Sequence, residues 1–259
     1  MSKVYAIMNQ KGGAGKTTTA GALAAGLTLL GFSVLSVDLD AQRNFTYTAK
    51  PIQTTLKPKP ENATILGVLM GEINAEDAIQ HTESGDLIPA CKALSGADAV
   101  LTDTGKEYKL REALEPIRDR YDFIILDTPP ALGILSINAL TACDSVIIPA
   151  QADIYSLQGI EQLADTMKPV KKYCNPALTI EGILLTRYSP RSVLSREVAE
   201  LAERIAETLG TRVFKTTIRE AVAVKEAQIK RKSLYGYAPN AKVTGDYTNF
   251  IEELLGEES

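Results

Sequence analysis

Asn9-Gln10-Lys11-Gly12-Gly13-Ala14-Gly15-Lys16-Thr17-Thr18 is the stretch of this 259-residue chain that decides its fold. It stands between a short apolar segment at residues 4–8 and a helical pattern at residues 17–30. Three glycines in four residues allow backbone N–H groups to turn inward, and the start of the next helix adds partial positive charge. This strand–loop–helix context favours a phosphate-binding loop over a glycine-rich turn that merely begins a helix.

Two lysines and a threonine give the loop its predicted chemistry. Lys16 would contact the β- and γ-phosphates of a nucleotide, and the Thr17 hydroxyl would bind magnesium. The usual pattern has glycine where Gln10 stands, and here a second lysine, Lys11, lies inside the loop. At the outer edge of the loop, Lys11 could reach a nucleotide held by another subunit and make association depend on the γ-phosphate. A solvated surface lysine is the alternative.

Acidic residues follow two of the predicted strands at the same edge of the sheet. Asp127 ends the buried segment at residues 122–126, where a carboxylate is costly unless it is paired or serves a metal ion. We predict that it supports magnesium. Asp38 and Asp40 follow the segment at residues 33–37, and either could orient the attacking water. Turn residues or helix caps are the alternative at these positions.

Short apolar segments alternate with helical patterns along nearly the whole chain. This alternation predicts an α/β fold: one three-layer domain over residues 1–259, with a mostly parallel twisted sheet and helices on both faces. Residues 50–60 are predicted to form a surface loop and residues 64–80 short helices. Strands are predicted at residues 4–8, 33–37, 85–90, 122–126, 145–149 and 180–185, and helices at residues 17–30, 133–142, 159–173 and 194–209.

Two of these helices carry further expectations. Pro169 is expected to kink the helix at residues 159–173 or to end it early. The helix at residues 194–209 has one apolar face, which carries Leu194, Val198, Leu201, Ile205 and Leu209.

The composition excludes several classes of protein. Hydrophobic residues make up 45% of the chain and charged residues 23%, as in ordinary globular proteins, and no apolar run approaches the roughly 18 residues of a membrane span. Three cysteines form no close pair, and the N-terminus lacks the apolar stretch of a signal peptide, so we expect a reducing cytoplasm. Because the net charge is −4, DNA binding would need a local basic patch.

Together with later segments, these residues resemble the ParA/MinD group of ATPases, which have a deviant Walker A loop. KGGAGKTT at residues 11–18 is similar to that loop, SVDLDAQRN at 36–44 to switch I, and DTPPALG at 127–133 with SINAL at 136–140 to switch II. Residues 147–153, 182–188 and 237–242 continue the resemblance, which is weakest at about residues 50–108. Within the group the chain is most similar to the short ParA proteins of the Soj type, which partition chromosomes or plasmids.

The resemblance implies a role for each candidate residue. Lys11 corresponds to the signature lysine that contacts the partner subunit's nucleotide in an ATP-sandwich homodimer. Lys16 and Thr17 correspond to the phosphate lysine and the Mg²⁺ ligand. Asp40 corresponds to the aspartate that positions the hydrolytic water, and Asp127 to the Walker B carboxylate that serves the metal. The residues expected to hold ATP are Lys11, Gly12, Gly13, Ala14, Gly15, Lys16, Thr17 and Thr18.

The resemblance also implies a function. In this family the ATP-bound dimer binds double-stranded DNA non-specifically, and a ParB-type centromere-binding protein stimulates ATP hydrolysis and release. We therefore expect an ATP-dependent switch for chromosome or plasmid partitioning, with Mg²⁺ and ATP as cofactors. We expect the protein to be cytoplasmic and associated with the nucleoid.

Two segments depart from the family pattern. The switch I sequence Asp-Pro-Gln-Gly-Asn reads DAQRN at residues 40–44, so we expect a loop that is looser at Ala41 and stiffer at Arg43. The Pro-Arg-Asn motif is replaced by REA at residues 219–221, and a nearby DNA-binding arginine by Ala223. We therefore expect different adenine contacts and a different DNA patch.

Residues 187–232 carry a local excess of positive charge, with 11 basic and 6 acidic residues. Dimerisation would double such a patch, and phosphate contacts gain strength with their number. A solvated helix face is the alternative. The expected DNA contacts are Arg191, Lys225, Lys230, Arg231 and Lys232.

Two other functions share the phosphate site. A MinD-like membrane-associated ATPase needs a basic amphipathic C-terminal helix, whereas residues 249–259 are acidic and anionic lipid would repel them, so we expect no membrane binding. A metabolic ligase of the same fold is the second alternative, because a phosphate loop does not identify the acceptor.

Overall fold

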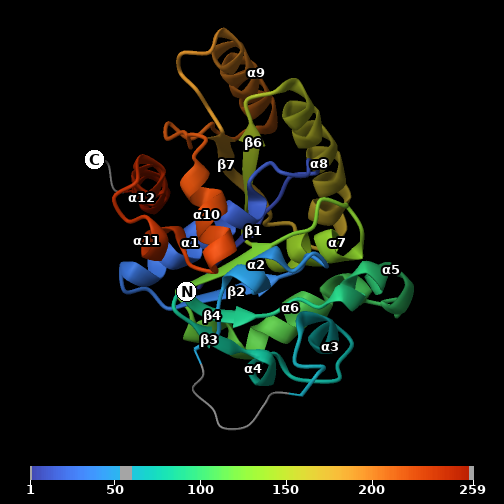
Figure 1. Ribbon diagram of the computed structural model, residues 1–259. Coiled ribbons are helices and arrows are strands. Elements are labelled where there is room, and N and C mark those ends of the chain that lie inside the picture. Colours follow the sequence, from blue (N-terminus) through green and yellow to red (C-terminus); the bar gives the residue numbers. More distant parts are fainter. Residues whose placement is uncertain (1, 53–59, 257–259) are drawn as a thin grey trace.

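A seven-stranded sheet lies between two layers of helices in the computed structural model, which describes residues 2–52 and 60–256 (Figure 1). The strand order is β3-β4-β2-β5-β1-β6-β7, and each neighbouring pair is parallel except β3 and β4. The predicted three-layer α/β fold is therefore confirmed. The strands are β1 (Lys3–Ile7), β2 (Val34–Asp38), β3 (Gln80–Thr82), β4 (Gly85–Ile88), β5 (Phe123–Asp127), β6 (Ser145–Gln151) and β7 (Thr179–Thr186).

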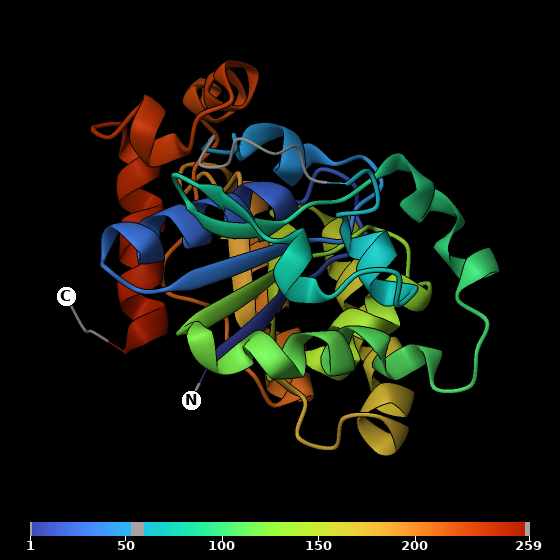
Figure 2. The same cartoon turned by 90° about the horizontal axis from the view of Figure 1, so that it is seen from below.

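The helices divide between the two faces of the sheet (Figures 1 and 2). One face is covered by α1, with α11 and α12 packed against it, and the other by α3, α6, α7, α8 and α9. The helices are α1 (Lys16–Leu29), α2 (Asn44–Thr48), α3 (Ile65–Leu69), α4 (Ala75–Ala78), α5 (Ala97–Val100), α6 (Lys109–Leu114), α7 (Ile134–Ala142), α8 (Ile154–Tyr173), α9 (Val193–Leu209), α10 (Val222–Lys230), α11 (Leu234–Tyr237) and α12 (Lys242–Leu255).

The central strands are mostly apolar because each contributes side chains to both cores. In β1, Val4 and Ala6 face the α7–α8 side, whereas Tyr5 and Ile7 face α1. The same alternation divides β5, which explains why its sequence shows no polar alternation. With both sides packed, these strands hold their carboxyl ends at fixed positions along one edge of the sheet.

Extended chain covers both outer strands of the sheet. At one side β3 pairs antiparallel with β4, and the Ile52 N–H donates to the carbonyl of His81 at 2.8 Å. At the other side, residues 212–218 run along β7. Here the Phe214 N–H donates to the carbonyl of Ile183 at 2.9 Å, and the Ile218 N–H to that of Leu185 at 2.8 Å. Among the described residues, extended chain therefore covers part of each outer strand, β3 and β7.

The structure differs from the expectations in several elements. Pro169 does not end its helix, because α8 runs from Ile154 to Tyr173. The predicted apolar face of α9 is confirmed in part. Val198 is buried and Ile205 and Leu209 pack against the core, whereas Leu194 and Leu201 are 59% and 41% exposed. The small residues Ala202 and Ala206 complete the buried face. The helices α2, α5, α6, α10, α11 and α12 and the strand β3 had no predicted counterpart. Residues 53–59 of the predicted surface loop lie outside the described residues.

Candidate nucleotide-binding site

The loop between β1 and α1 has the backbone that its glycines predict. Gly13 and Gly15 have φ of 80° and 96°, and Gly15 directly precedes the first turn of α1. Side chains from the neighbouring strands hold the loop. The Thr186 hydroxyl of β7 donates to the Ala14 carbonyl at 2.9 Å, and the Gln151 amide of β6 donates to that of Gly13. The loop is therefore fixed at the carboxyl ends of parallel strands, where α/β sheets bind ligands.

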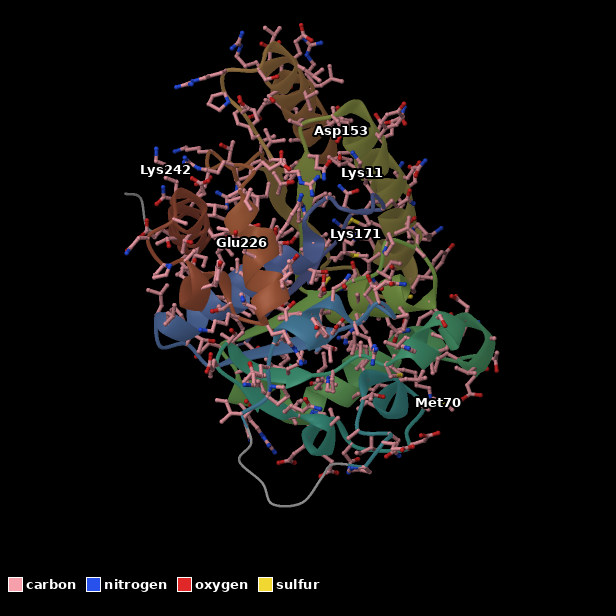
Figure 3. All side chains as sticks on the ribbon, in the orientation of Figure 1. Lys11, Met70, Asp153, Lys171, Glu226 and Lys242 are labelled. Carbon is pink, nitrogen blue, oxygen red and sulfur yellow. The ribbon has the colours of Figure 1, made fainter. Side chains whose placement is uncertain are left out.

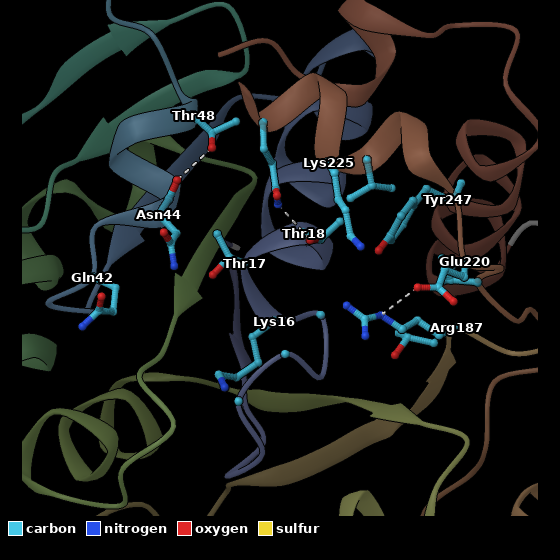
Figure 4. Close-up of a pocket in the computed structure, with 18 of the residues that line it drawn as sticks. Lys16, Thr17, Thr18, Gln42, Asn44, Thr48, Arg187, Glu220, Lys225 and Tyr247 are labelled. Atoms are coloured by element: carbon cyan, nitrogen blue, oxygen red, sulfur yellow. Dashed lines mark hydrogen bonds and ion pairs between the residues drawn. The ribbon is translucent and has the colours of Figure 1, made fainter. Parts of the chain in front are cut away.

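A cavity of about 680 Å³ opens beside this loop (Figure 4). Its walls come from the loop, from the segment leading into α2, from residues 218–221 and from α10. In Figure 4, Lys16, Thr17 and Thr18 lie between Gln42 and Asn44 on one side and Lys225 and Tyr247 on the other. Its volume is that of a small-molecule site, and one wall is built to bind phosphate.

Lys16 is a buried cation in this wall, with 7% of its surface exposed. Its Nζ donates to the carbonyl of Lys11 at 3.3 Å. Burial lowers the pKa of Lys16, while the carboxylates of Asp127 and Asp40 oppose that shift. A buried ammonium with one long hydrogen bond has donors left for an anion in the cavity.

Asp127 supplies the complementary acidic group. Its side chain is fully buried, and within the described residues neither carboxylate oxygen has a hydrogen-bond partner. Burial and then the neighbouring Asp38 raise the pKa of Asp127 well above its usual value, and the Thr17 hydroxyl and Lys16 oppose this shift. Oxygen atoms without partners, next to a hydroxyl at the mouth of a phosphate loop, fit a divalent cation. Thr17 and Asp127 could therefore hold a metal ion.

Asp38 and Asp40 have different environments. The buried Asp38 accepts hydrogen bonds from the Thr46 N–H at 2.8 Å, the Thr46 hydroxyl at 2.7 Å and the Asp40 N–H at 3.1 Å. Burial raises the pKa of Asp38 to about 6. Asp40 is half-buried, accepts from the Gln42 N–H at 2.9 Å and lines the cavity. Asp38 thus anchors the start of α2, whereas Asp40 faces the space where a reacting group would sit.

Lys11 does not line the cavity of its own chain. Its Nζ pairs with Asp153, the residue that caps the N-terminus of α8, and lies 3.3 Å from Oε1 of Gln151 (Figure 3). Burial raises the pKa of Asp153, but hydrogen bonds from Lys11 and Ser156 outweigh this effect and lower it overall. The Lys11 side chain is therefore held against a carboxylate and is not a freely solvated lysine.

Arg43 has a left-handed backbone conformation. Its φ is 58°, in the left-handed region, where a side chain costs about 1–2 kcal/mol relative to the right-handed region. The residue caps the N-terminus of α2 through its backbone, and the Tyr47 N–H donates to its carbonyl at 2.8 Å.

Ion pairs occupy the place of the missing Pro-Arg-Asn motif. Arg219 binds Asp246 through two hydrogen bonds of 2.6 Å, and Glu220 lies 4.0 Å from Nε of Arg187. Arg187, Arg219 and Glu220 all line the cavity. Charged side chains therefore line this wall of the cavity.

The expected DNA contacts do not form one cluster. Lys225 lies on α10 and lines the cavity, Lys230 ends that helix, and Arg231 and Lys232 follow it, all four side chains being exposed. Arg191 lies on a different element, just before α9. Sequence reasoning missed several residues of the site, because only the fold brings them to it: Gln151, Asp153, Arg187, Gln228 and Tyr247.

Comparisons with known proteins agree with this site. The model of the AAA domain family matches residues 2–180. The chain is 38% identical over 257 residues to the sporulation initiation inhibitor protein Soj of Bacillus subtilis, covering 98% of each protein. It is 38% identical over 261 residues to the chromosome partitioning protein ParA of Caulobacter vibrioides, covering 99% of this chain and 95% of the relative.

A solved structure matches the fold over the same extent. Cobyrinic acid a,c-diamide synthase from Mycobacterium smegmatis, with bound ATP analogue and magnesium, superposes with a TM-score of 0.81 at 32% identity. The match covers 98% of this chain and 95% of that one. The phosphate loop, the parallel sheet and these full-length relatives lead to one conclusion: the chain belongs to the AAA domain family and, within it, to the ParA/Soj group of P-loop proteins.

Proposed function

We propose that the protein is an ATP-dependent switch that partitions a chromosome or plasmid. The observation that carries the proposal is the separation of the two loop lysines. Lys16 lies buried at the cavity, whereas Lys11 lies outside it and pairs with Asp153. A cation positioned outside its own phosphate site suits a partner's nucleotide, so that two copies would associate only when ATP is present.

ATP and Mg²⁺ are the proposed cofactors. The relative from M. smegmatis was solved with an ATP analogue and magnesium, and the loop residues 11–18 match its family's pattern. Thr17 and Asp127 would hold the metal ion, which would neutralise charge on the β- and γ-phosphates. Lys16 would bind the same phosphates, and Asp40 would orient the water that attacks the γ-phosphate.

Replacing Lys11 with alanine tests the proposed dimer. The variant should still bind ATP, because Lys16 and the loop backbone remain, but it should stay monomeric with a non-hydrolysable ATP analogue. Sedimentation velocity of the wild type and the variant, each with and without the analogue, measures this difference.

Asp153→Asn is the matched control for Lys11→Ala. It removes the carboxylate that holds Lys11 but keeps the lysine, so the ATP-dependent dimer should form at a lower protein concentration than in the wild type. ATP-dependent dimers of Lys11→Ala would refute the assignment of Lys11 to the partner's nucleotide.

Non-specific binding of double-stranded DNA is the proposed output of the ATP-bound state. The exposed residues Lys230, Arg231 and Lys232 would contact phosphates, together with Lys225 and Arg191. Each phosphate contact contributes about 0.9 to the slope of log affinity against log salt, so a dimer should show a slope of several. Anisotropy of labelled DNA of arbitrary sequence, with ADP and with ATP at several salt concentrations, tests this. A ParB-type partner would then stimulate hydrolysis and release.

An amide-forming ligase is the second candidate, since the solved structure from M. smegmatis that superposes on this chain is that of a diamide synthase. Such an enzyme turns over ATP in step with an acceptor acid. ATP hydrolysis that DNA accelerates in the absence of any acceptor would favour the partition switch. Hydrolysis that depends on a corrinoid carboxylate would favour the ligase.

A membrane switch has less support. Within the described residues no helix has both the length and the apolar character needed to cross a bilayer. Glu252 and Glu253 lie on the last helix, α12, and anionic lipid would repel both. Sedimentation with anionic liposomes in the presence of ATP should leave the protein in the supernatant.

A further inference from the structure

Three arginines have an unusual backbone conformation near the nucleotide cavity. In the described part of the chain, the residues other than glycine with positive φ are Arg43, Arg187 and Arg231, at 58°, 50° and 53°. Glycine is the ordinary occupant of such positions, because it has no Cβ to clash with the backbone. Arg231 directly follows α10, at the point where helices often end in glycine. Favourable contacts of the Arg231 side chain would offset the cost of this backbone conformation.

That side chain contacts α2, which we call the switch I helix because it begins at the last residue of the segment that resembles switch I. The Nε of Arg231 donates to the carbonyl of Tyr47 at 2.8 Å, and the centre of the guanidinium lies 4.3 Å from the centroid of the Tyr47 ring. One planar cation thus contacts both the backbone and the aromatic face of a residue on α2. We call this contact the Arg231–Tyr47 clasp.

Two contacts, the clasp and a hydrogen bond from Gln228, join the region of α10 to other elements that line the nucleotide cavity. Tyr47 lines the cavity and lies on α2, which directly follows the cavity-lining residues Asp40 and Gln42. On the opposite side, the Gln228 amide of α10 donates to the Thr18 hydroxyl at 3.3 Å (Figure 4). Movement of Arg231 would therefore change the position of α2 and of the segment before it, which carries Asp40.

The same arginine stands in the exposed basic run formed by Lys230, Arg231 and Lys232. A phosphate binds a guanidinium best through two parallel N–H donors in the plane of the group. The edge of the guanidinium that contains Nε can bind a phosphate only if the hydrogen bond from Nε to Tyr47 breaks. The Tyr47 carbonyl and a phosphate are therefore alternative partners of that edge.

We propose that Arg231 is a positioning residue that exchanges between Tyr47 and a DNA phosphate, so that DNA binding releases the switch I helix. This inference rests on the proposed DNA-binding function and names the residue through which DNA reaches the hydrolytic site. Without DNA the clasp is closed and α2 is tethered to α10. With DNA bound, Arg231 leaves Tyr47, and the segment that carries Asp40 loses that tether.

A single fluorophore can report the state of the clasp. The chain contains no tryptophan, so Tyr47→Trp introduces the only indole and places it under the guanidinium. Tyr47→Trp, loaded with a non-hydrolysable ATP analogue, is titrated with a short labelled DNA duplex of arbitrary sequence. Tryptophan emission reports the clasp, and anisotropy of the DNA label reports binding independently.

Two further variants in the Tyr47→Trp background separate the clasp from simple charge. Arg231→Gly keeps the left-handed backbone that glycine adopts easily but removes the guanidinium. Lys230→Ala removes the adjacent exposed cation and leaves the clasp intact. Each variant should lower the slope of log DNA affinity against log salt by about 0.9.

The expected result is specific to Arg231. Saturating DNA should shift the emission of Tyr47→Trp to the spectrum that Tyr47→Trp/Arg231→Gly has without DNA. The Arg231→Gly variant should show no further shift although DNA binds, and the Lys230→Ala variant should show the full shift. A rise in anisotropy with unchanged emission would overturn the exchange while leaving DNA binding in place. No rise in anisotropy would overturn both the exchange and the proposed DNA-binding function.

Discussion

Lys16→Ala abolishes nucleotide binding, the largest effect that we expect from any single substitution. Lys16 is the buried cation at the cavity. Its ammonium group makes one long hydrogen bond of 3.3 Å, to the Lys11 carbonyl, so donors remain for phosphate oxygens. Charge-assisted hydrogen bonds contribute about 1.5–3 kcal/mol each, and the triphosphate would accept more than one of them. ATP affinity should therefore fall by at least about 100-fold. Titration calorimetry with ATP and magnesium measures the loss.

The fold should survive this change, because it removes a buried charge without opening the backbone of the loop. Lys168→Ala is the matched control, since Lys168 is 76% exposed on α8 and pairs only with the exposed Asp165. Its ATP affinity should equal that of the wild type. If Lys16→Ala bound ATP as tightly as the control, the assignment of this loop as the phosphate site would be wrong.

Asp40→Ala stops turnover but preserves the ATP-dependent dimer. Asp40 lines the cavity and is half-buried, so it is placed to orient water without being needed to hold the phosphates. Loss of a group that positions or activates the nucleophile lowers kcat by about 10²–10⁴-fold. Single-turnover hydrolysis of labelled ATP, together with sedimentation of the same sample, tests both halves of the expectation.

Asp103→Ala provides the comparison for Asp40→Ala. Asp103 is an exposed acidic residue, 79% accessible, that does not line the cavity. Its removal should change neither the rate nor the dimer. Normal hydrolysis by Asp40→Ala would remove Asp40 from its proposed role and direct attention to the other carboxylates of the site.

The sequence carried enough information to predict the centre of this protein. β1, β2, β5, β6 and β7 were found within a residue or two of their bounds, because strands packed on both faces are apolar throughout. The phosphate loop was found because its chemistry is local: glycines, a lysine and a threonine within one turn of chain. Asp127 could be predicted for a similar reason, since burying a carboxylate at the end of an apolar strand costs free energy unless a metal ion or another group pairs with it.

The parts that could not be predicted depend on contacts distant in sequence. α2 is held by the buried Asp38, whose carboxylate accepts from Thr46 eight residues later. Asp153 gave no signal of its own, because its importance comes from Lys11, which lies 142 residues away. The face of α9 was predicted only in part: Val198 is buried as expected, but Leu194 and Leu201 are exposed and two alanines lie on the buried side. Periodicity reports which residues are apolar, but not which of them a neighbouring helix has room to accept.

The extended segments beside β4 and β7 have a consequence for assembly. A sheet that ended in an open strand could recruit a second molecule by backbone pairing at any time, with or without ligand. Among the described residues, residues 51–52 cover part of β3, the strand beside β4, and residues 212–218 cover part of β7. Backbone pairing at these two flanks is therefore restricted, which favours association through side chains, the kind of contact that a bound nucleotide can switch on and off.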